Sequence, residues 1–209
     1  MPTINWIFVT VSLIIIALAG LLAYSNTFNV PFVFDDIHSI VESRARRQPD
    51  WGWRSWAGTR ALPSKALDLN YRFNKLDVTG YHAVNLLVHI LASMGAFAVA
   101  YGLAKQSLPR RRWQFYGLAA DNWQVIAMVA GLMFVLHPIQ TQAVTYIVQR
   151  LASIATMFYL WSLATYIFYQ QTKGEKRYVW AALSILAMLA SMHSKEIAIT
   201  IPLVVALLE

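Results

Sequence analysis

Residues 81–104, YHAVNLLVHILASMGAFAVAYGLA, form the stretch that decides the fold. It contains no Asp, Glu, Lys or Arg, and a helix needs roughly 20 mostly apolar residues to cross a bilayer. Five further stretches come near this length, at 5–24, 122–137, 151–169, 178–193 and 197–208. We therefore predict an all-α integral membrane protein with about six transmembrane helices.

The composition supports this class. Hydrophobic residues make up 58% of the 209 residues, charged residues only 13%, and the mean hydropathy is +0.48. A soluble domain carries about 25% charged residues. The absence of cysteine excludes disulfides, thiolate chemistry and cysteine metal sites. The net charge of +7 comes from short clusters between apolar stretches, which favours anionic lipid head groups over nucleic acid as the partner.

Two features bear on the ends of the chain. The first apolar stretch is longer than the usual apolar core of a signal peptide and no Lys or Arg precedes it, which favours a retained anchor. The sixth stretch is short and stops at Glu209. We expect residues 1–209 to be a single membrane domain that is incomplete at its C-terminus.

Positive charge predicts the orientation. Lys105 and 110–112 fall between the second and third stretches, and 173–177 fall between the fourth and fifth. With both clusters in the cytoplasm, the N-terminus is cytoplasmic, and 25–80, 137–150 and 193–197 lie on the extracytoplasmic face. In the long first loop, 25–80, we expect interfacial helices at about 36–43 and 67–76, with a solvated loop as the alternative.

Many polar side chains are predicted to share the extracytoplasmic face or the interior beside it. His82, Asn85 and His89 follow one helical stripe and should face the bundle interior, where hydrogen bonding between helices is the common role. The expected extracytoplasmic groups are Asp35, Asp36, His38, His137, Gln142, Arg150, His193, Lys195 and Glu196.

The acidic pair and two cations are the candidates for chemistry. Asp35 or Asp36 could cap a following helix, but an ionised carboxylate is also a suitable general base for a hydroxyl. Arg150 and Lys195 could extend to the interface, and Lys195 could simply pair with Glu196. Both cations would also suit the phosphate of a lipid-linked donor.

A divalent cation is a further alternative. The two aspartates with His38 or His137 offer ligands that suit Mg²⁺ or Mn²⁺. The sequence contains no tight ligand spacing of the His-Glu-x-x-His type. Metal dependence therefore stays open, and no metal ligand is assigned.

Several motifs occur together in one order. They are FDD at 34–36, GYHAVNLLVH at 80–89, HPIQTQAV at 137–144, Arg150, and SKE at 194–196. This set resembles the membrane domain of the GT-C glycosyltransferases, specifically the transmembrane-and-TPR-repeat protein O-mannosyltransferases and their bacterial relatives. The resemblance covers nearly the whole chain, and only the N-terminal part of such enzymes. Eukaryotic relatives tend to carry a glutamate where this chain has Gln142.

The resemblance implies an activity and roles for residues. It implies inverting transfer of a sugar from a polyprenyl-phosphate donor to an acceptor hydroxyl, of a protein Ser/Thr or of a glycan, on the extracytoplasmic face. Asp35 or Asp36 would be the base, and Arg150 and Lys195 would offset charge on the departing phosphate. The implied pocket residues are His38, His82, Asn85, His89, His137, Gln142 and Glu196.

The alternative function is a non-catalytic membrane subunit, or a truncated remnant, that binds a lipid or a partner protein. A missing C-terminal TPR region or a further subunit would then complete the assembly. A small proton transporter is disfavoured because the predicted spans hold no acidic residue at mid-membrane depth. The bacterial type of the motifs favours a bacterial cytoplasmic membrane.

Overall fold

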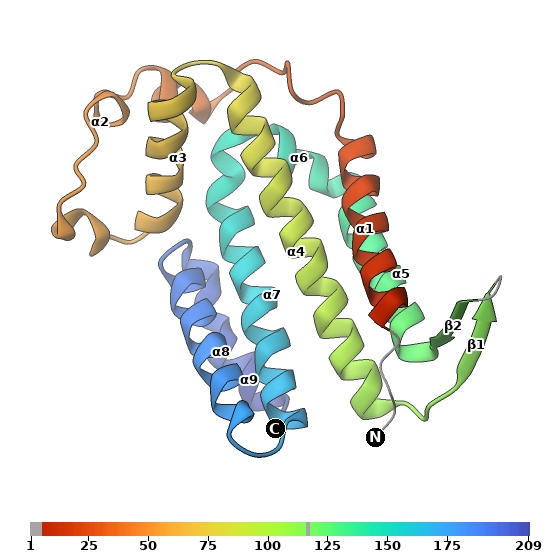
Figure 1. Cartoon of the computed structure of the whole chain (residues 1–209). Helices are drawn as coiled ribbons and strands as arrows, with labels where there is room; N and C mark the ends of the chain where they lie inside the picture. The colour runs from red at the N-terminus through yellow and green to blue at the C-terminus, as the bar shows by residue number, and fades with distance from the viewer. Residues whose placement is uncertain (1–5, 116–117) are drawn as a thin grey trace.

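The computed structural model describes residues 6–115 and 118–209, and its core is a set of helices packed around one long central helix. This helix is α4 (Val78–Ser107), which packs against α5 (Asn122–Leu136) on one side and α7 (Arg150–Gln171) on the other. Helix α1 (Trp6–Ala23) covers α5, and α8 (Lys176–Met192) covers α7. Figure 1 shows this arrangement.

Small residues let the helices approach closely. A Cβ atom built on Gly102 of α4 would lie 2.5 Å from Cγ2 of Ile167 in α7, and one on Gly131 of α5 would lie 2.5 Å from Cδ1 of Ile16 in α1. Such contacts are typical of helix interfaces in membranes, where packing rather than a hydrophobic driving force holds helices together.

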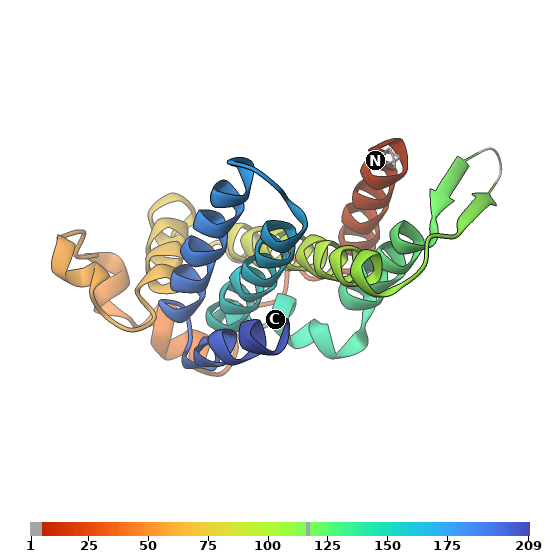
Figure 2. The same cartoon turned by 90° about the horizontal axis from the view of Figure 1, so that it is seen from below.

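Short elements complete the two ends. A hairpin of β1 (Arg112–Phe115) and β2 (Leu118–Asp121) joins α4 to α5, with Arg112 opposite Asp121. The other end carries the connection from α1 to α4, which includes the π-helix η1 (Ile37–Val41), α2 (Arg44–Arg47), the 3-10 helix η2 (Trp53–Trp56) and α3 (Ala61–Asn74). Figure 2 shows the hairpin and the α2–η2 region projecting on opposite sides of the bundle.

The expected all-α membrane class is confirmed in its coarse form, while the number of six spans is not. In the described part of the chain, three helical stretches are long and apolar enough to cross a membrane, namely Trp6–Ala23, Val78–Ser107 and Ile147–Gln171. A fourth results if α5 and 138–145 count as one span bent by 48°. The bend follows His137-Pro138, because proline interrupts a helix.

The last two predicted spans are shorter than the roughly 20 residues of a typical membrane crossing, and neither is confirmed as a span. Helix α8 has 17 residues, and residues 197–208 fall on the 3-10 helix η5 (Glu196–Thr200) and the seven-residue α9 (Ile201–Leu207). The interfacial helices differ in position from their prediction. The first is shorter, at Ile37–Val41, and the second begins six residues earlier, at Ala61.

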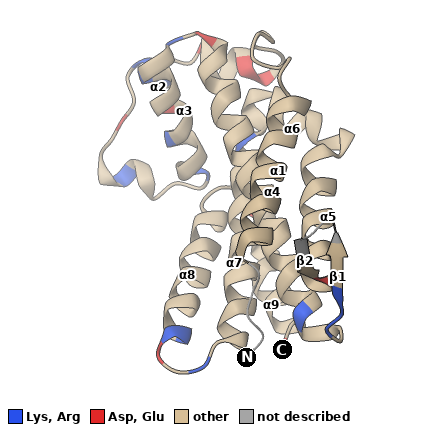
Figure 3. Cartoon of the chain, turned by 45° about the vertical axis from the view of Figure 1, so that its right-hand side comes forward, with Lys and Arg blue, Asp and Glu red and all other residues tan. Residues whose placement is uncertain are grey.

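The predicted basic clusters lie at one end of the bundle, together with the start of α1 and the end of the chain after α9 (Figures 1 and 3). The opposite end carries α2, α3 and the segment that follows α5. This segment consists of η3 (Pro138–Gln140), α6 (Thr141–Thr145) and η4 (Ile147–Gln149). A buried cluster of Ile40, Leu67, Tyr81 and Ile147 fastens η1, α3, α4 and η4 to one another.

Candidate functional site

The acidic pair is presented by a sharp turn at the end of the segment that follows α1. The amide of Asp36 donates to the carbonyl of Val33 (3.0 Å), and Phe34 has a φ of +50°. This backbone conformation is uncommon for a bulky residue and costs about 1–3 kcal/mol, so it persists only where the surrounding structure holds it. The Phe34 ring contacts the ring of Tyr146 edge-on, with centroids 6.0 Å apart. The turn directs the two aspartates into different environments.

Asp36 is fully buried and serves as a clamp. One carboxylate oxygen accepts the amide hydrogen of Val148 in η4 (2.8 Å), and the other accepts that of Val33 (3.2 Å). Burial raises the pKa of this carboxyl above its ordinary value, and the hydrogen bonds from backbone amides partly oppose the rise. Its side chain does not cap η1. Asp36 therefore joins the first loop to the start of α7.

Asp35 is exposed and lies beside Tyr146. The Asp35 amide donates to the Tyr146 hydroxyl (3.2 Å). Burial, the hydrogen bond to the Asp35 carboxylate and that negative charge raise the pKa of the Tyr146 hydroxyl, and the bond with the Asp35 amide partly opposes the rise. Tyr146 thus stays protonated and can donate to the carboxylate. Of the two aspartates, Asp35 is the one that a substrate can reach from solvent.

Arg150 is completely buried at the first residue of α7. Its Nε donates to Asn85 Oδ1 (2.7 Å), Nη2 to the Tyr81 carbonyl (2.8 Å), and Nη1 to the Asn70 side chain and the Ala66 carbonyl. The guanidinium also lies 5.7 Å from the centroid of the Tyr81 ring. These neutral acceptors come from α3 and α4. The contacts favour a structural role, and the expected phosphate contact of Arg150 stays a prediction.

The predicted polar stripe on α4 does face the interior. His82, Asn85 and His89 are at most 2% exposed. Asn85 directs its amide toward the carbonyl of Val144 (3.2 Å), and the two histidines approach the carbonyls of Val30 (2.8 Å) and Val135 (3.2 Å). The stripe thereby ties α4 to the ends of three other segments. Nδ1 of His82 is buried without a hydrogen-bond partner in the described part of the chain.

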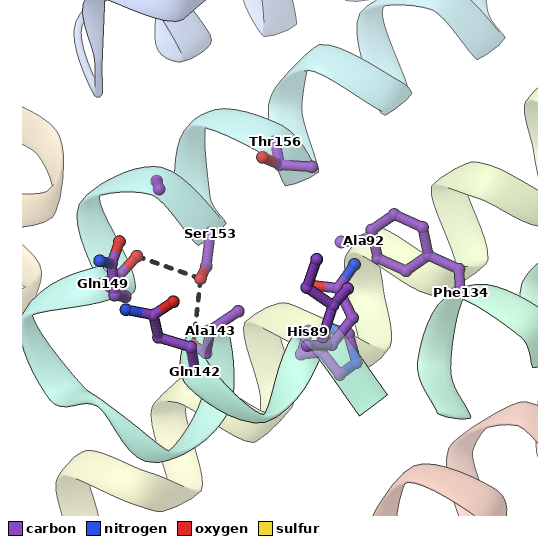
Figure 4. A pocket seen from close by; sticks show the side chains of 11 residues that line it. His89, Ala92, Phe134, Gln142, Ala143, Gln149, Ser153 and Thr156 are labelled. Carbon is purple, nitrogen blue, oxygen red and sulfur yellow. Dashed lines mark hydrogen bonds between the residues drawn. The ribbon is translucent and has the colours of Figure 1, made fainter. Parts of the chain in front are cut away.

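A cavity of about 240 Å³ lies between α4, α5, α6 and α7 (Figure 4). His89 and Phe134 lie on one side of it, while Gln142, Gln149 and Ser153 lie on the other. No charged side chain lines the cavity. The complete lining is His89, Ala92, Phe134, Ile139, Gln140, Gln142, Ala143, Gln149, Ala152, Ser153 and Thr156. Its neutral donors and acceptors beside an aromatic ring suit an uncharged, hydroxyl-rich ligand.

The α6–η4 segment links this cavity to the acidic pair. Gln142 and Gln149 line the cavity, whereas Tyr146 and Val148 contact Asp35 and Asp36. Neither aspartate lines the cavity itself. Of the predicted pocket residues, His89 and Gln142 line this cavity, and the roles assigned to the other residues stay predictions.

The remaining predicted groups lie elsewhere at the surface. His38 pairs with Glu42 (2.7 Å), and His137 accepts the amide hydrogen of Ile139 through Nδ1 (3.3 Å). Glu196 does not pair with its neighbour Lys195. Both of its carboxylate oxygens bind the guanidinium of Arg60 instead, at 3.0 and 3.1 Å.

Lys195 is half-buried and His193 is exposed where α8 ends. Lys195 makes no ion pair with any residue that the structure describes. The described ranges 6–115 and 118–209 contain no group of three His, Asp or Glu side chains able to hold an ion, and metal dependence stays open.

Sequence reasoning missed three groups that shape the site, namely Tyr146, Asn70 and Tyr81. Tyr146 lies just beyond the HPIQTQAV motif, so a search for a hydroxyl near the acidic pair could have considered it. Asn70 follows Leu67 by three residues on the buried face of α3. Without the position of α3, nothing in the sequence pairs Asn70 with Arg150.

Curated relatives support the resemblance to protein O-mannosyltransferases. The protein O-mannosyl-transferase tmtc2 of Xenopus laevis is 30% identical over 77% of this chain and 19% of its own length. Human TMTC3 is 27% identical over 85% of the chain and 19% of its own length. The Caenorhabditis elegans protein F38B6.6, also named as such an enzyme, is 25% identical over 94% of the chain and 28% of its length.

The chain thus spans about a fifth to a quarter of the length of these relatives. No family model matches it. No solved structure matches it either. The predicted resemblance to the N-terminal part of the transmembrane-and-TPR-repeat O-mannosyltransferases is confirmed by the relatives.

Proposed function

Because the chain resembles the N-terminal part of these protein O-mannosyltransferases, we propose that it carries the acidic centre of a membrane glycosyltransferase. The enzyme transfers mannose from a polyprenyl-phosphate carrier to a protein hydroxyl, with inversion, on the extracytoplasmic face. The observation that carries this proposal is the exposed Asp35 carboxylate, held beside the Tyr146 hydroxyl by a strained turn. This end of the bundle lies opposite both basic clusters.

Asp35 is the proposed base, and Asp36 positions it. In the reaction, the acceptor O–H bond breaks and its proton passes to the Asp35 carboxylate, while the oxygen forms a bond to C1 of the sugar. The bond between C1 and the carrier phosphate breaks, and its electron pair leaves with the polyprenyl phosphate. A phosphate leaving group needs no protonation, so one carboxylate is sufficient.

Lys195 is the proposed contact for the carrier phosphate. It is half-buried and unpaired in the described part of the chain, and Arg60 neutralises its neighbour Glu196. Arg150 contributes by fixing Asn85, Asn70 and the Tyr81 backbone, because its own donors are engaged by these acceptors. The neutral cavity beside α6 is the proposed site for sugar hydroxyls.

The test is a transfer assay on membranes that contain the protein, with polyprenyl-phosphate mannose and a Ser/Thr-rich acceptor peptide. Asp35→Asn is expected to reduce transfer by at least about 100-fold, a loss within the range for general base catalysis. Glu42→Gln is the matched control, because Glu42 is an exposed carboxylate of the same region that pairs with His38. Asp35→Asn membranes with unaltered transfer would reject Asp35 as the base.

The competing function is a non-catalytic subunit that binds a lipid or a partner. The observation that favours it is that neither aspartate lines the neutral cavity beside α6. If the protein, in membranes that retain it folded, shows no transfer that depends on Asp35 or Asp36, this function gains support.

A further inference from the structure

A second cavity, of about 230 Å³, lies outside the acidic centre, between α2, the segment after it and the last turn of α3. Its lining combines four cationic side chains with two aromatic ones. The full lining is Arg46, Arg47, Pro49, Trp51, Tyr71, Arg72 and Lys75. No carboxylate lines it, and none of the residues proposed for sugar transfer does so.

The four cations differ in how far they are neutralised. Arg46 binds Asp68 (2.6 Å) and is nearly buried, so its charge is compensated. Arg47 donates to the Val41 carbonyl (3.1 Å), which leaves its charge uncompensated. Arg72 and Lys75 are exposed and form no ion pair with any residue in 6–115 or 118–209. Three positive charges therefore border one small cavity.

A buried lysine of α3 fixes one wall of the cavity. Lys65 is buried, pairs with Asp68 (3.5 Å), donates to the Asp50 carbonyl, and lies 5.0 Å from the centroid of the Trp51 ring. These contacts hold Trp51 and the segment beside it against α3. The positive charges therefore border a cavity with a fixed wall, because the buried Lys65 holds the segment around Trp51 against α3.

The surroundings of the cavity indicate where its ligand comes from. Trp53 and Phe73 are each 78% exposed, and Leu69 and Leu76 of the same region are also exposed. Indole and phenyl rings at such positions prefer the boundary between head groups and acyl chains. A phosphate in this boundary layer belongs to a lipid, whose acyl chains would contact the exposed rings.

We propose that this cavity binds the phosphate of an anionic phospholipid head group at the extracytoplasmic bilayer surface. Arg47 and Arg72 contact the phosphate oxygens, and guanidinium groups suit these because they form paired hydrogen bonds. Lys75 adds a third charge. The lipid anchors the α2–α3 region to the bilayer and takes no part in sugar transfer.

The experiment follows the tryptophan fluorescence of the purified protein, with brominated phosphatidylglycerol or brominated phosphatidylcholine in mixed micelles as the quencher. Because the chain has eight tryptophans, the Trp51 contribution is taken as the difference between the protein and its Trp51→Phe variant. In this Trp51 contribution, phosphatidylglycerol is expected to quench at lower concentration than phosphatidylcholine. The double variant R47Q/R72Q is expected to weaken the phosphatidylglycerol effect by roughly 25-fold, from about fivefold for each charge near an anionic surface.

The matched control is the double variant R44Q/R54Q. It removes the same charge from two exposed arginines of the same segment that do not line the cavity. The control is expected to retain the preference for phosphatidylglycerol. An equal loss in both double variants would overturn the proposal, because it would indicate diffuse attraction to the segment as a whole.

Soluble phosphate distinguishes the source of the ligand. Inorganic phosphate and glycerol 3-phosphate are added in separate titrations, and neither is expected to displace the lipid at concentrations similar to that of the lipid. Full displacement by either one would overturn the lipid assignment in favour of a free anion. Transfer activity is measured in parallel, and an unchanged rate in R47Q/R72Q separates this cavity from the proposed acidic centre.

Discussion

The Asp36 carboxylate accepts the amide hydrogen of Val148 at 2.8 Å, across 112 positions of the sequence. This contact joins the first loop to the residues directly before α7, and the same two segments hold Asp35 against Tyr146. One aspartate of the pair therefore shapes the site, while its neighbour is left free to react. The two residues should respond differently to substitution.

Asp36→Ala is expected to destabilise the protein by about 2 kcal/mol, because it leaves the amides of Val33 and Val148 without their acceptor. Asp35→Ala should change the free energy of unfolding by less than about 0.5 kcal/mol, as is usual for an exposed side chain. Thermal unfolding in detergent, followed by circular dichroism, measures both. Equal stability of the two variants would contradict the assigned roles.

The raised pKa of Asp36 predicts how stability depends on pH. The Asp36 carboxyl binds its proton more tightly in the folded state than in the unfolded chain, where its pKa has the ordinary value of 3.8. The resulting stabilisation is fully present below that value and is lost as the pH rises through the raised pKa. Asp36→Asn cannot titrate, so its unfolding curve should lack this component. Unfolding midpoints measured in steps upward from about pH 4 test this, and identical profiles in the two proteins would count against it.

Arg150→Met is expected to destabilise the protein by about 3 kcal/mol, because the Asn85 and Asn70 side-chain oxygens and the Tyr81 carbonyl lose their donor. Arg150→Lys keeps the charge but not the planar fork, so it should be intermediate. Resistance of the folded state to limited proteolysis provides the measurement. If Arg150 served the donor phosphate alone, both variants would lose transfer and keep full stability.

The apolar stretches and the buried stripe were predictable because they depend on local spacing. His82, Asn85 and His89 recur at helical intervals in an apolar stretch, and such a stripe must face other protein groups. The positive clusters likewise predicted which loops share one end of the bundle. Spans that depend on helix breaks were less predictable. The third predicted stretch, 122–137, ends just before Pro138, and the helix there counts as a span only together with 138–145.

The different roles of Asp35 and Asp36 were not predictable from sequence. Neighbouring residues on a tight turn face different surroundings, and here, after Phe34 with its positive φ, Asp35 is exposed while Asp36 is buried. The partner of Glu196 was also hidden. Arg60 binds Glu196 across 136 positions of the sequence, because α3 and η5 both pack against α7. The sequence alone suggested only the adjacent Lys195 as a partner. Such pairings depend on tertiary packing.

Gly102→Val is expected to destabilise the contact between α4 and α7 by about 1–3 kcal/mol, the usual cost of overpacking. The new Cβ would lie 2.5 Å from Cγ2 of Ile167. Gly58→Val is the matched control, because a Cβ there meets no atom within 4 Å. Adding Ile167→Ala to Gly102→Val removes Cγ2 and should recover part of the loss. Thermal unfolding of the unaltered protein, Gly102→Val, Ile167→Ala and the double variant measures the coupling, and an absence of recovery would contradict this close approach.

Filling the neutral cavity tests its place in the proposed reaction. Ala152 lines the cavity from α7, and Ala152→Leu adds three carbon atoms to this lining. If sugar hydroxyls bind there, this variant should raise KM for the mannose donor by about 10-fold or more, while the Asp35 environment stays intact. Ala83→Leu is the matched control on α4, because Ala83 is exposed and outside the cavity. A KM that rises equally in both variants, or in neither, would remove the cavity from the proposed site and leave Asp35 as its remaining support.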